Sequence, residues 1–258
     1  MTTQHPLVSI ITVTFNAATS IESTMHSILG QQPGLFEWIV IDGASIDDTV
    51  NMIKAGAKDA PLTIRSEPDE GLYDAMNKGL EQATGTYTIF MNSGDSFLDL
   101  DVLRDFERLL AGREQLPAMV YGHTLVEFHD GATLHRRTRP LRYIAHGQPT
   151  IHQSVFFRRD VHLNMKYPHS AYPISSDYAV MAGLQSEPGN EILLWDRTVS
   201  IFRNDPRSAS NRKAFQRIRE AWRIQRDVLS VPLPLRILSA GWRVAVVPYY
   251  NFRFSRQS

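Results

Sequence analysis

Residues 66–95 read SEPDEGLYDAMNKGLEQATGTYTIFMNSGD, and this stretch decides the fold. After an opening turn, apolar residues recur at helical spacing over 72–83, which predicts an amphipathic helix. Residues 86–91 form a short β-rich apolar run that stops abruptly at the polar sequence NSGD, residues 92–95. Ligands of open α/β sheets bind at the carboxyl edge of the strands, so we place the chemistry there.

The preceding residues repeat this alternation of strand and helix. A buried strand is predicted at residues 7–15, further strands at 36–41 and 62–65, and helices between them at 21–29 and 45–57. Polar residues again follow the strands, with Asn16 after the first and Asp42 after the second. The alternation favours a mostly parallel sheet with right-handed crossovers, which brings these polar residues to one edge.

The rest of the chain mixes both types of element. Strands are predicted at 118–128, 132–136, 154–158 and 192–202, a loop at 140–149, and helices at 100–110, from 175, at 211–229 and at 233–247. The turn at Asp130-Gly131 indicates a small antiparallel hairpin. We therefore expect an α/β domain over residues 1–210 and a basic, amphipathic helical segment over residues 211–258.

Composition and absent motifs exclude several classes of protein. The 258 residues include no cysteine, which excludes a disulfide framework and thiolate metal sites. No Gly-rich phosphate loop, HExxH or GxSxG motif occurs, which argues against P-loop kinases, NAD enzymes, zinc proteases and serine hydrolases. The N-terminal residues lack the apolar core of a signal peptide, and no uncharged apolar run is long enough to span a bilayer.

Two carboxylates stand at strand ends, where both can face one ligand. A carboxylate at the position of Asp42 or Asp95 can bind a ribose or coordinate a divalent cation. Either residue can equally cap the helix that follows it. Lys78 and its neighbour Asn77 lie on the helix beside this edge. A lysine there contacts phosphate or belongs to a solvated helix face.

Two further candidates come later in the chain. Asp177 follows two serines at a predicted helix start, where an N-cap role alone explains it. Its functional interpretation requires the fold to bring it opposite Asp95. His152, with Gln153, lies in a polar gap before a strand, and it either binds an acceptor or satisfies a loop.

Four motifs in order resemble glycosyltransferase family 2. They are ITVTFN at 11–16, VIDGASIDDT at 40–49, SEPDEGLYDAMNKG at 66–79, and the run that ends FMNSGD at 90–95. The resemblance is strong over residues 7–95 and moderate over 150–210. It implies the GT-A fold, with a Rossmann-like sheet flanked by helices, and an inverting glycosyltransferase of hexosyltransferase type that uses a nucleotide-diphosphate sugar. The motifs are most similar to transferases of bacterial exopolysaccharide and O-antigen synthesis.

The resemblance also implies roles for single residues. Thr14, Asn16 and Asp42 would hold the base and ribose, with Asn77, Lys78, Asn92 and Arg203 also on the nucleotide-sugar side. Asp95 would be the metal ligand for Mg²⁺ or Mn²⁺, and Asn92 and Gly94 stand where the family's metal motif has its other positions. Asp177 would be the catalytic base, and His152 and Gln153 would bind the acceptor. Ser210 falls with Arg203 in a diphosphate-side loop.

The expected activity is transfer of one sugar per encounter, because the QxxRW motif of the processive family members does not follow Gln216. The acceptor would be a saccharide, linked to lipid. The enzyme would be cytoplasmic and would meet this acceptor at the inner face of the plasma membrane, and we expect no nucleic-acid partner. Two other classes remain open. One is a nucleotidyltransferase, although the Gly-rich basic N-terminal loop of that class is missing from residues 11–19, and the other is a catalytically inactive nucleotide-sugar-binding or scaffold subunit of a polysaccharide assembly complex.

The C-terminal segment suggests how such an enzyme would reach a membrane. Residues 203–258 contain twelve basic and three acidic residues, a formal charge of +9 that the remainder of the chain balances. Apolar residues of 233–247, among them Trp242, suit an interfacial helix on anionic lipid. The alternative is that Leu235, Leu238 and Trp242 pack on the sheet domain or in a homodimer.

Overall fold

A computed structural model gives the fold, and it describes residues 5–187, 189–204 and 213–241. The chain divides into two compact units. The first comprises residues 1–139, 150–167 and 189–204, and the second comprises 140–149, 168–188 and 205–258. The predicted boundary between residues 210 and 211 lies outside the described residues and stays a prediction, as does the role of Ser210.

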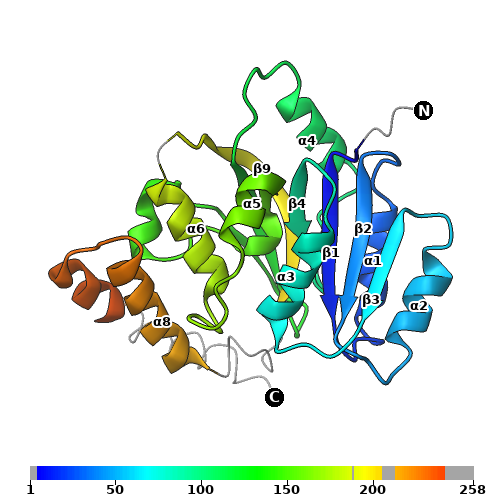
Figure 1. Ribbon diagram of the computed structural model, residues 1–258, viewed down its shortest axis with the longest axis horizontal. Helices are drawn as coiled ribbons and strands as arrows, with labels where there is room; N and C mark the ends of the chain where they lie inside the picture. Colours follow the sequence, from blue (N-terminus) through cyan, green and yellow to red (C-terminus); the bar gives the residue numbers. More distant parts are fainter. Residues whose placement is uncertain (1–4, 188, 205–212, 242–258) are drawn as a thin grey trace. The chain divides into compact units, whose positions relative to one another are not determined.

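The first unit is built on one nine-stranded sheet (Figure 1). Its order is β3-β2-β1-β4-β8-β6-β9-β5, with β7 paired to β6. The strands are β1 (Val8–Thr14), β2 (Phe36–Asp42), β3 (Leu62–Ser66), β4 (Tyr87–Phe90), β5 (Ser96–Phe97), β6 (Met119–Phe128), β7 (Thr133–Arg136), β8 (Val155–Arg158) and β9 (Ile192–Asn204). The first four pair in parallel as predicted, because a helix follows each of β1, β2 and β3 and returns the chain to the same end of the sheet.

The other half of the sheet is mixed rather than parallel. Strand β8 runs antiparallel to both β4 and β6, and β5 runs antiparallel to β9, while β6 and β9 are parallel. The predicted hairpin is confirmed as the antiparallel pair β6–β7. Strand β5 was not predicted, because two residues are too few to show a periodic pattern.

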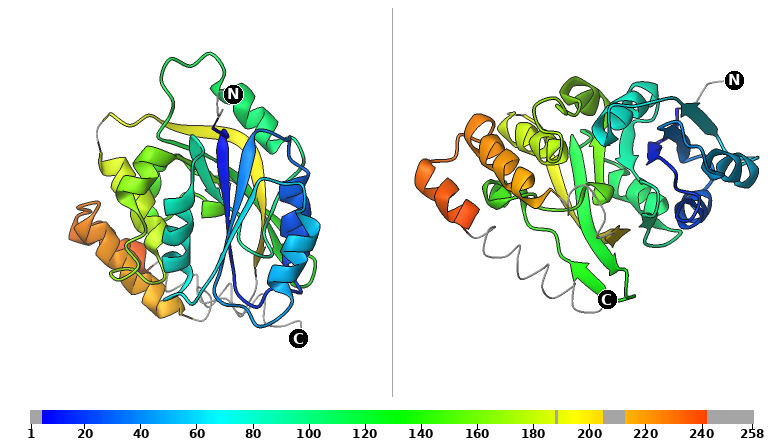
Figure 2. Two further views of the ribbon diagram at one scale, coloured as in Figure 1. Left: turned by 45° about the vertical axis from the view of Figure 1, so that its right-hand side comes forward. Right: turned by 90° about the horizontal axis from the view of Figure 1, so that it is seen from below.

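Helices cover both faces of this sheet (Figure 2). Those of the first unit are α1 (Ile21–Leu29), α2 (Thr49–Gly56), α3 (Leu72–Gln82), α4 (Val102–Leu110), α5 (Arg159–Met165) and the 3₁₀ helix η2 (His152–Ser154). Residues of α1, α2 and α4 share a core with Ile10 and Trp38. Helix α3 packs on the other face, where the position of a Cβ on Gly79 would lie 2.4 Å from Cγ2 of Ile11.

The second unit is helical. It contains the 3₁₀ helix η1 (Leu141–His146), α6 (Ser176–Ser186), α8 (Ala214–Asp227) and a further helical stretch at residues 233–241. Residues 140–149 were predicted as a loop, and six of them instead form η1. Helices α6 and α8 lie side by side (Figures 1 and 2). Within the described residues, no helix is both long and apolar enough to cross a membrane, and Trp242 lies beyond them.

Candidate active site

Three chain reversals follow three neighbouring strands at the carboxyl edge of the sheet. Asn16, Ala44 and Gly94 stand just past β1, β2 and β4, and all three have left-handed backbones, with φ of 48°, 63° and 98°. Left-handed conformations of non-glycine residues are costly and tend to persist at functional sites. Thr14 of β1 pairs with Asp42 of β2, so the polar residues that follow these two strands meet as predicted.

Asp42 is fully buried, and its carboxylate anchors the loop after β2. It accepts hydrogen bonds from the Ser45 backbone N–H at 2.9 Å, from Ser45 Oγ at 2.5 Å and from Ser66 Oγ at 2.6 Å. These contacts tie the end of β2 to the end of β3. This geometry is that of a loop anchor, and ribose binding by Asp42 stays a prediction.

The loop after β1 is held by the same network. The Asn16 backbone N–H donates to Ser45 Oγ at 2.8 Å, and Asn16 Oδ1 accepts from the Ile46 N–H at 3.0 Å. Thr14 Oγ1 is buried and has no hydrogen-bond partner among the described residues. Between them, the Phe15 side chain is 62% exposed. The sequence analysis missed this exposed aromatic ring at the carboxyl edge, because TVTF is simply typical of an apolar strand.

Asp95, the acidic residue of the NSGD motif, is buried, with 5% of its surface exposed. Its Oδ1 accepts from the Arg203 backbone N–H at 3.0 Å, and its Oδ2 accepts from Gln153 Nε2 at 2.6 Å. Burial raises the pKa of Asp95 to about 7, although both hydrogen bonds act to lower it. A carboxylate with a strongly raised pKa at a strand edge is a candidate functional group.

The pair His152-Gln153 lies beside this motif, on η2. Besides the contact of Gln153 with Asp95, the His152 Nε2 lies 3.4 Å from Nδ2 of Asn92. The fold therefore brings together two motifs that are about sixty residues apart in the chain. Gln153 contacts the predicted metal ligand directly, and acceptor binding by the pair stays a prediction.

Several oxygens around Asp95 have no partner. Asn92 Oδ1, Ser93 Oγ and Gln153 Oε1 are buried and make no hydrogen bond within the described part of the chain. Hard oxygens of this kind suit Mg²⁺ or Mn²⁺, which bind through one or two carboxylates and take other ligands from phosphate and water. The described residues include no cluster of three acidic or histidine ligands. The donor set thus fits a cation that shares its coordination with a bound diphosphate.

Asn77 and Lys78 are engaged in contacts within the first unit. Asn77 clamps the backbone of Tyr167, donating to its carbonyl at 3.0 Å and accepting from its N–H at 2.8 Å. Lys78 Nζ lies 3.0 Å from Asp74 and 3.3 Å from Glu67, and the hydrogen bond to Asp74 raises the pKa of Lys78. Their predicted contacts with the nucleotide sugar would compete with these bonds and stay predictions.

Arg203 reaches the site through its backbone. Its N–H holds Asp95, while its side chain is 46% exposed and places Nε 3.4 Å from Oε2 of Glu127. The predicted position of Arg203 near the diphosphate side is compatible with this geometry, and a role for its guanidinium stays a prediction.

Asp177 belongs to the second unit, as the second residue of α6. Its Oδ1 accepts from the Tyr178 N–H and its Oδ2 accepts from Gln148 Nε2, each at 2.8 Å. Gln148 is a contact that the sequence analysis missed, because nothing in residues 140–149 signals a partner for a helix start. Asp95 belongs to the first unit, so the approach of Asp177 to Asp95 stays a prediction.

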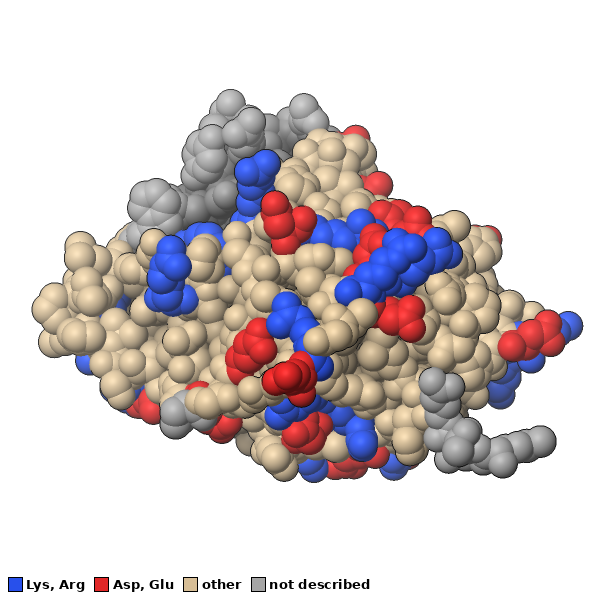
Figure 3. Space-filling view, turned by 90° about the horizontal axis from the view of Figure 1, so that it is seen from above, with Lys and Arg blue, Asp and Glu red and all other residues tan. Residues whose placement is uncertain are grey.

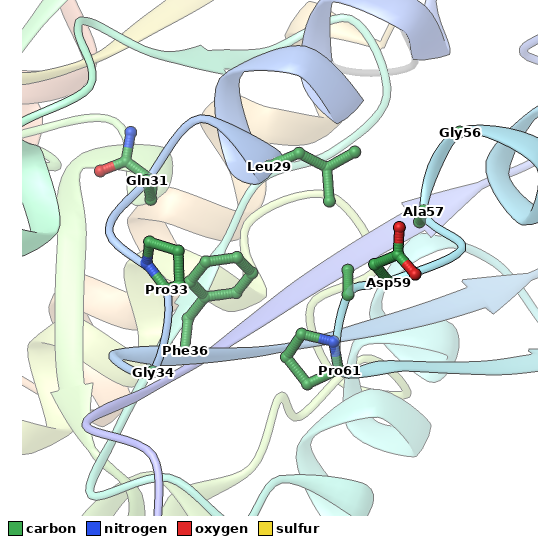
Figure 4. Close-up of a pocket in the computed structure, with 10 residues that line it drawn as sticks. Leu29, Gln31, Pro33, Gly34, Phe36, Gly56, Ala57, Asp59 and Pro61 are labelled. Carbon is green, nitrogen blue, oxygen red and sulfur yellow. The ribbon is translucent and has the colours of Figure 1, made fainter.

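A hollow of about 280 Å³ lies elsewhere in the first unit (Figure 4). Its lining comes from the end of α1, the start of β2 and the segment between α2 and β3, which is the amino edge of the sheet. Leu29, Phe36 and Pro61 give it apolar walls, and Asp59 is the single carboxylate among the residues that line it. It lacks the paired polar groups that chemistry needs, and the carboxyl edge remains the candidate site.

Charged side chains of both signs are mixed on one face of the molecule. On the face drawn in Figure 3, basic and acidic side chains alternate instead of forming a patch of one sign. Surface ion pairs such as Arg104–Asp101 and Arg108–Asp105 follow the same mixed pattern. Isolated exposed pairs of this kind contribute little to stability or binding.

The carboxyl edge of this α/β sheet therefore holds a buried carboxylate among oxygens that have no hydrogen-bond partner in the described part of the chain. The family model for "Glycosyl transferase family 2" matches residues 9–172. That match covers more than half of the chain, and the chain belongs to this family.

Curated relatives agree with the family. The chain is 31% identical over 159 residues to "PGL/p-HBAD biosynthesis glycosyltransferase" of Mycobacterium bovis, which covers 60% of each protein. It is 37% identical over 99 residues to "Putative teichuronic acid biosynthesis glycosyltransferase TuaG" of Bacillus subtilis, covering 38% of this chain and 39% of that protein. The chain thus matches about 60% of the length of the mycobacterial relative.

Solved structures confirm the predicted GT-A fold. S. aureus TarS 1-349 in complex with UDP has a TM-score of 0.66 and 17% identity, covering 97% of this chain and 73% of that one. The mannosyltransferase PcManGT from Pyrobaculum calidifontis, in complex with GDP-Man and Mn²⁺, has a TM-score of 0.65 and 18% identity, covering 99% and 77%. At these identities the likeness shows the fold alone.

Proposed function

We propose that the chain transfers one sugar from a nucleotide-diphosphate sugar to a hydroxyl of a saccharide acceptor, with inversion at the anomeric carbon. The observation that carries this proposal is the buried Asp95, held at the carboxyl edge by Gln153 and by the Arg203 backbone among oxygens without partners. Family membership and the names of the relatives support the same chemistry.

The reaction proceeds in one step. Asp177 accepts the proton of the acceptor hydroxyl as its oxygen forms a bond to the anomeric carbon, and the bond from that carbon to the diphosphate breaks on the opposite side. Its carboxylate suits this role because the bonds from Tyr178 and Gln148 hold it in one orientation. A single displacement needs no enzyme nucleophile.

Asp95, with the amide oxygens of Asn92 and Gln153, would hold a divalent cation when the donor is bound. The cation would offset the charge that grows on the leaving diphosphate. Thr14, Asn16 and the exposed ring of Phe15 would then receive the nucleoside. The mannosyltransferase PcManGT, which shares the fold, binds GDP-Man together with Mn²⁺, and this supports the same arrangement as a hypothesis for this chain.

The acceptor that we propose is lipid-linked, and the product a surface polysaccharide or glycolipid. Relatives named for PGL/p-HBAD and teichuronic acid biosynthesis motivate this class. The helical residues 233–241 also motivate it, because Leu233, Ile237 and Leu238 are each more than half exposed. Such a surface would bring the enzyme to the inner face of the plasma membrane.

A donor screen tests the proposal. We expect UDP-GlcNAc, GDP-mannose or a dTDP-sugar to raise the melting temperature of the protein in Mn²⁺ or Mg²⁺, and the stabilising donor to be hydrolysed slowly without acceptor. Stabilisation without any hydrolysis would instead favour an inactive nucleotide-sugar-binding subunit. If no nucleotide sugar binds, the proposed function is wrong.

A further inference from the structure

Arg217 is a cation on the packed face of helix α8. The buried residues of that face include Glu220, Ala221 and Ile224. Arg217 precedes these residues by three, four and seven positions, so it lies on the same face, one turn nearer the start of the helix. It is half-buried, whereas Arg219, two positions on, is exposed.

This guanidinium has no hydrogen-bond partner within the described residues. The carboxylate of Glu220, one turn away, is bonded to other groups. It accepts hydrogen bonds from the Ile174 N–H at 3.0 Å and from Gln216 Nε2 at 2.9 Å. Burial lowers the pKa of Arg217, and the charge of Asp177 acts in the opposite direction. A half-buried guanidinium with free N–H donors on a packed helix face is available to bind an anion.

The start of helix α6 offers more donors in the same unit. Ser175 stands before the helix, is 4% exposed, and its hydroxyl has no partner in the described part of the chain. The N–H groups of a first helical turn also favour anions. Glu220, which shares the packed face with Arg217, holds the loop just before Ser175, which places this helix start against α8.

We propose that Arg217, together with Ser175 and the start of α6, binds a phosphate group next to Asp177. This inference rests on the proposed function and deepens it, because it gives the substrate at Asp177 a chemical class. The acceptor would be a saccharide that carries a phosphate, as in a sugar linked to lipid through phosphate. One guanidinium then separates two anions, the base and the phosphate, while five N–H donors match phosphate geometry. The other source of the same chemistry is the diphosphate of the donor.

Binding measured by calorimetry tests the site without turnover. The probe is glucose 1-phosphate in EDTA buffer, where no divalent cation bridges phosphate to Asp95. We expect Arg217→Gln to weaken its binding roughly ten-fold or more, and Arg219→Gln, which removes the same charge from an exposed position, to weaken it about two-fold at most. Arg217→Lys keeps the positive charge but loses the paired N–H donors of the guanidinium, and we expect its affinity for glucose 1-phosphate to lie between those of the wild type and Arg217→Gln.

A second arm separates the two sources of phosphate. UDP, GDP and dTDP are titrated with Mg²⁺ into the same proteins. If Arg217→Gln weakens the binding of the nucleotides and leaves the binding of glucose 1-phosphate unchanged, the phosphate site is upheld and its ligand is the diphosphate of the donor. Equal affinities of the wild type, Arg217→Gln and Arg217→Lys for every probe overturn the site, as does failure of glucose 1-phosphate and of all nucleotides to bind the wild type.

The proposed function and the phosphate site fail in different ways. If all variants bind nucleotides as the wild type does and no Arg217 variant changes the affinity for any probe, the proposed function stands and the phosphate site is wrong. If glucose 1-phosphate binds in a way that depends on Arg217 but no nucleotide binds, the phosphate site stands and the proposed function is wrong. Circular dichroism and the melting temperature of each variant establish that it is folded.

Discussion

The carboxylate of Asp95 is held by two donors in a buried position, one from the backbone and one from Gln153. Asp95→Asn keeps its shape and removes its charge. We expect divalent-dependent binding of the nucleoside diphosphate to be lost, together with most turnover, because one carboxylate supplies the charge of the predicted metal site. Calorimetry with and without Mn²⁺ measures this.

The matched control for Asp95 is Asp101→Asn, an exposed acid at the start of α4. It should leave nucleotide binding unchanged. Unaltered metal-dependent affinity in a folded Asp95→Asn protein would show that the carboxylate only fixes the loop of Gln153 and Arg203.

Asp177 lends itself to a test that separates binding from catalysis. A general base acts in the transition state, so we expect Asp177→Asn to bind the donor within a few-fold of wild type and to lose roughly 10²–10⁴-fold in transfer. The variant keeps an oxygen for the Tyr178 N–H, which preserves the helix start. Near-normal turnover of this protein would leave Asp177 as a helix-start residue with no role in proton transfer.

At the scale of elements, helix α3 approaches the sheet closely through Gly79. A Cβ there would lie 2.4 Å from Cγ2 of Ile11 and 3.2 Å from Cγ1 of Ile41. Alanine favours helices over glycine by about 1 kcal/mol. We nevertheless expect Gly79→Ala to lower the free energy of unfolding by about 1–3 kcal/mol, since overpacking against two branched core side chains outweighs propensity. Urea denaturation measures the change.

Gly56→Ala, in α2, serves as the comparison for Gly79. Its Cβ would meet the Sδ and Cε atoms of Met25, at 2.3 and 2.6 Å, which are the flexible end of a side chain. We expect a smaller loss or a gain there. A Gly79→Ala protein as stable as the wild type would mean that α3 can shift on the sheet.

Helix α5 carries a buried histidine that makes folding sensitive to acid. His162 is fully buried, and burial lowers its pKa to about 3. Its ring contacts Phe157, and its Nδ1 lies 2.7 Å from Thr88 Oγ1. The unfolded chain binds this proton at a pKa near ~6.5, so the stability is full above that pH and falls as the pH drops toward 3.

We expect His162→Phe to reduce this acid sensitivity. Between pH 6.5 and 5 the free energy of unfolding of the wild type should fall by up to about 1.4 kcal/mol per pH unit more than that of the variant. Urea midpoints at several pH values measure this, with exposed His129→Gln as the control. Parallel pH profiles for all three proteins contradict the assignment.

Local patterns predicted the strands and helices of residues 7–91, because β1, β2 and β4 are buried on both faces and the helices have one apolar side, although β3 at the sheet edge is largely exposed. The long-range arrangement was not accessible in this way. Strand β8 inserts between β4 and β6, which delivers Gln153 to Asp95 across 58 residues. The Arg203 backbone reaches Asp95 across 108 residues. Side-chain periodicity carries no information on such pairings, and this part of the site came from the structure.

At the scale of the whole molecule, charge and exposed apolar surface coincide in the second unit. Helix α8 and the residue before it carry Lys213, Arg217, Arg219, Arg223 and Arg226 against Glu220 and Asp227. The helical stretch at 233–241 is amphipathic, with its polar side toward the protein and its apolar side toward solvent. Arg236 stacks over Trp222, and Ser239 accepts from Gln225, so its polar residues turn toward α8.

The apolar residues of 233–241 face outward instead. Leu233, Ile237 and Leu238 are 52%, 56% and 69% exposed, and Leu233 and Ile237, four positions apart, share one side of the helix. An outward apolar face beside basic residues suits the surface of an anionic membrane, where each cation contributes about 1 kcal/mol. We therefore expect the protein to sediment with vesicles that contain phosphatidylglycerol and not with pure phosphatidylcholine vesicles, and the binding to weaken in high salt.

The double variant Ile237→Asp/Leu238→Asp places two charges on the outward face, and we expect it to lose at least about ten-fold in affinity for the anionic vesicles. Leu100→Asp is the control, since Leu100 is 60% exposed in the first unit and lies outside the basic segment. The alternative is a homodimer through this face. In that case the wild type elutes as a dimer in size-exclusion chromatography, the double variant elutes as a monomer, and neither protein sediments with anionic vesicles.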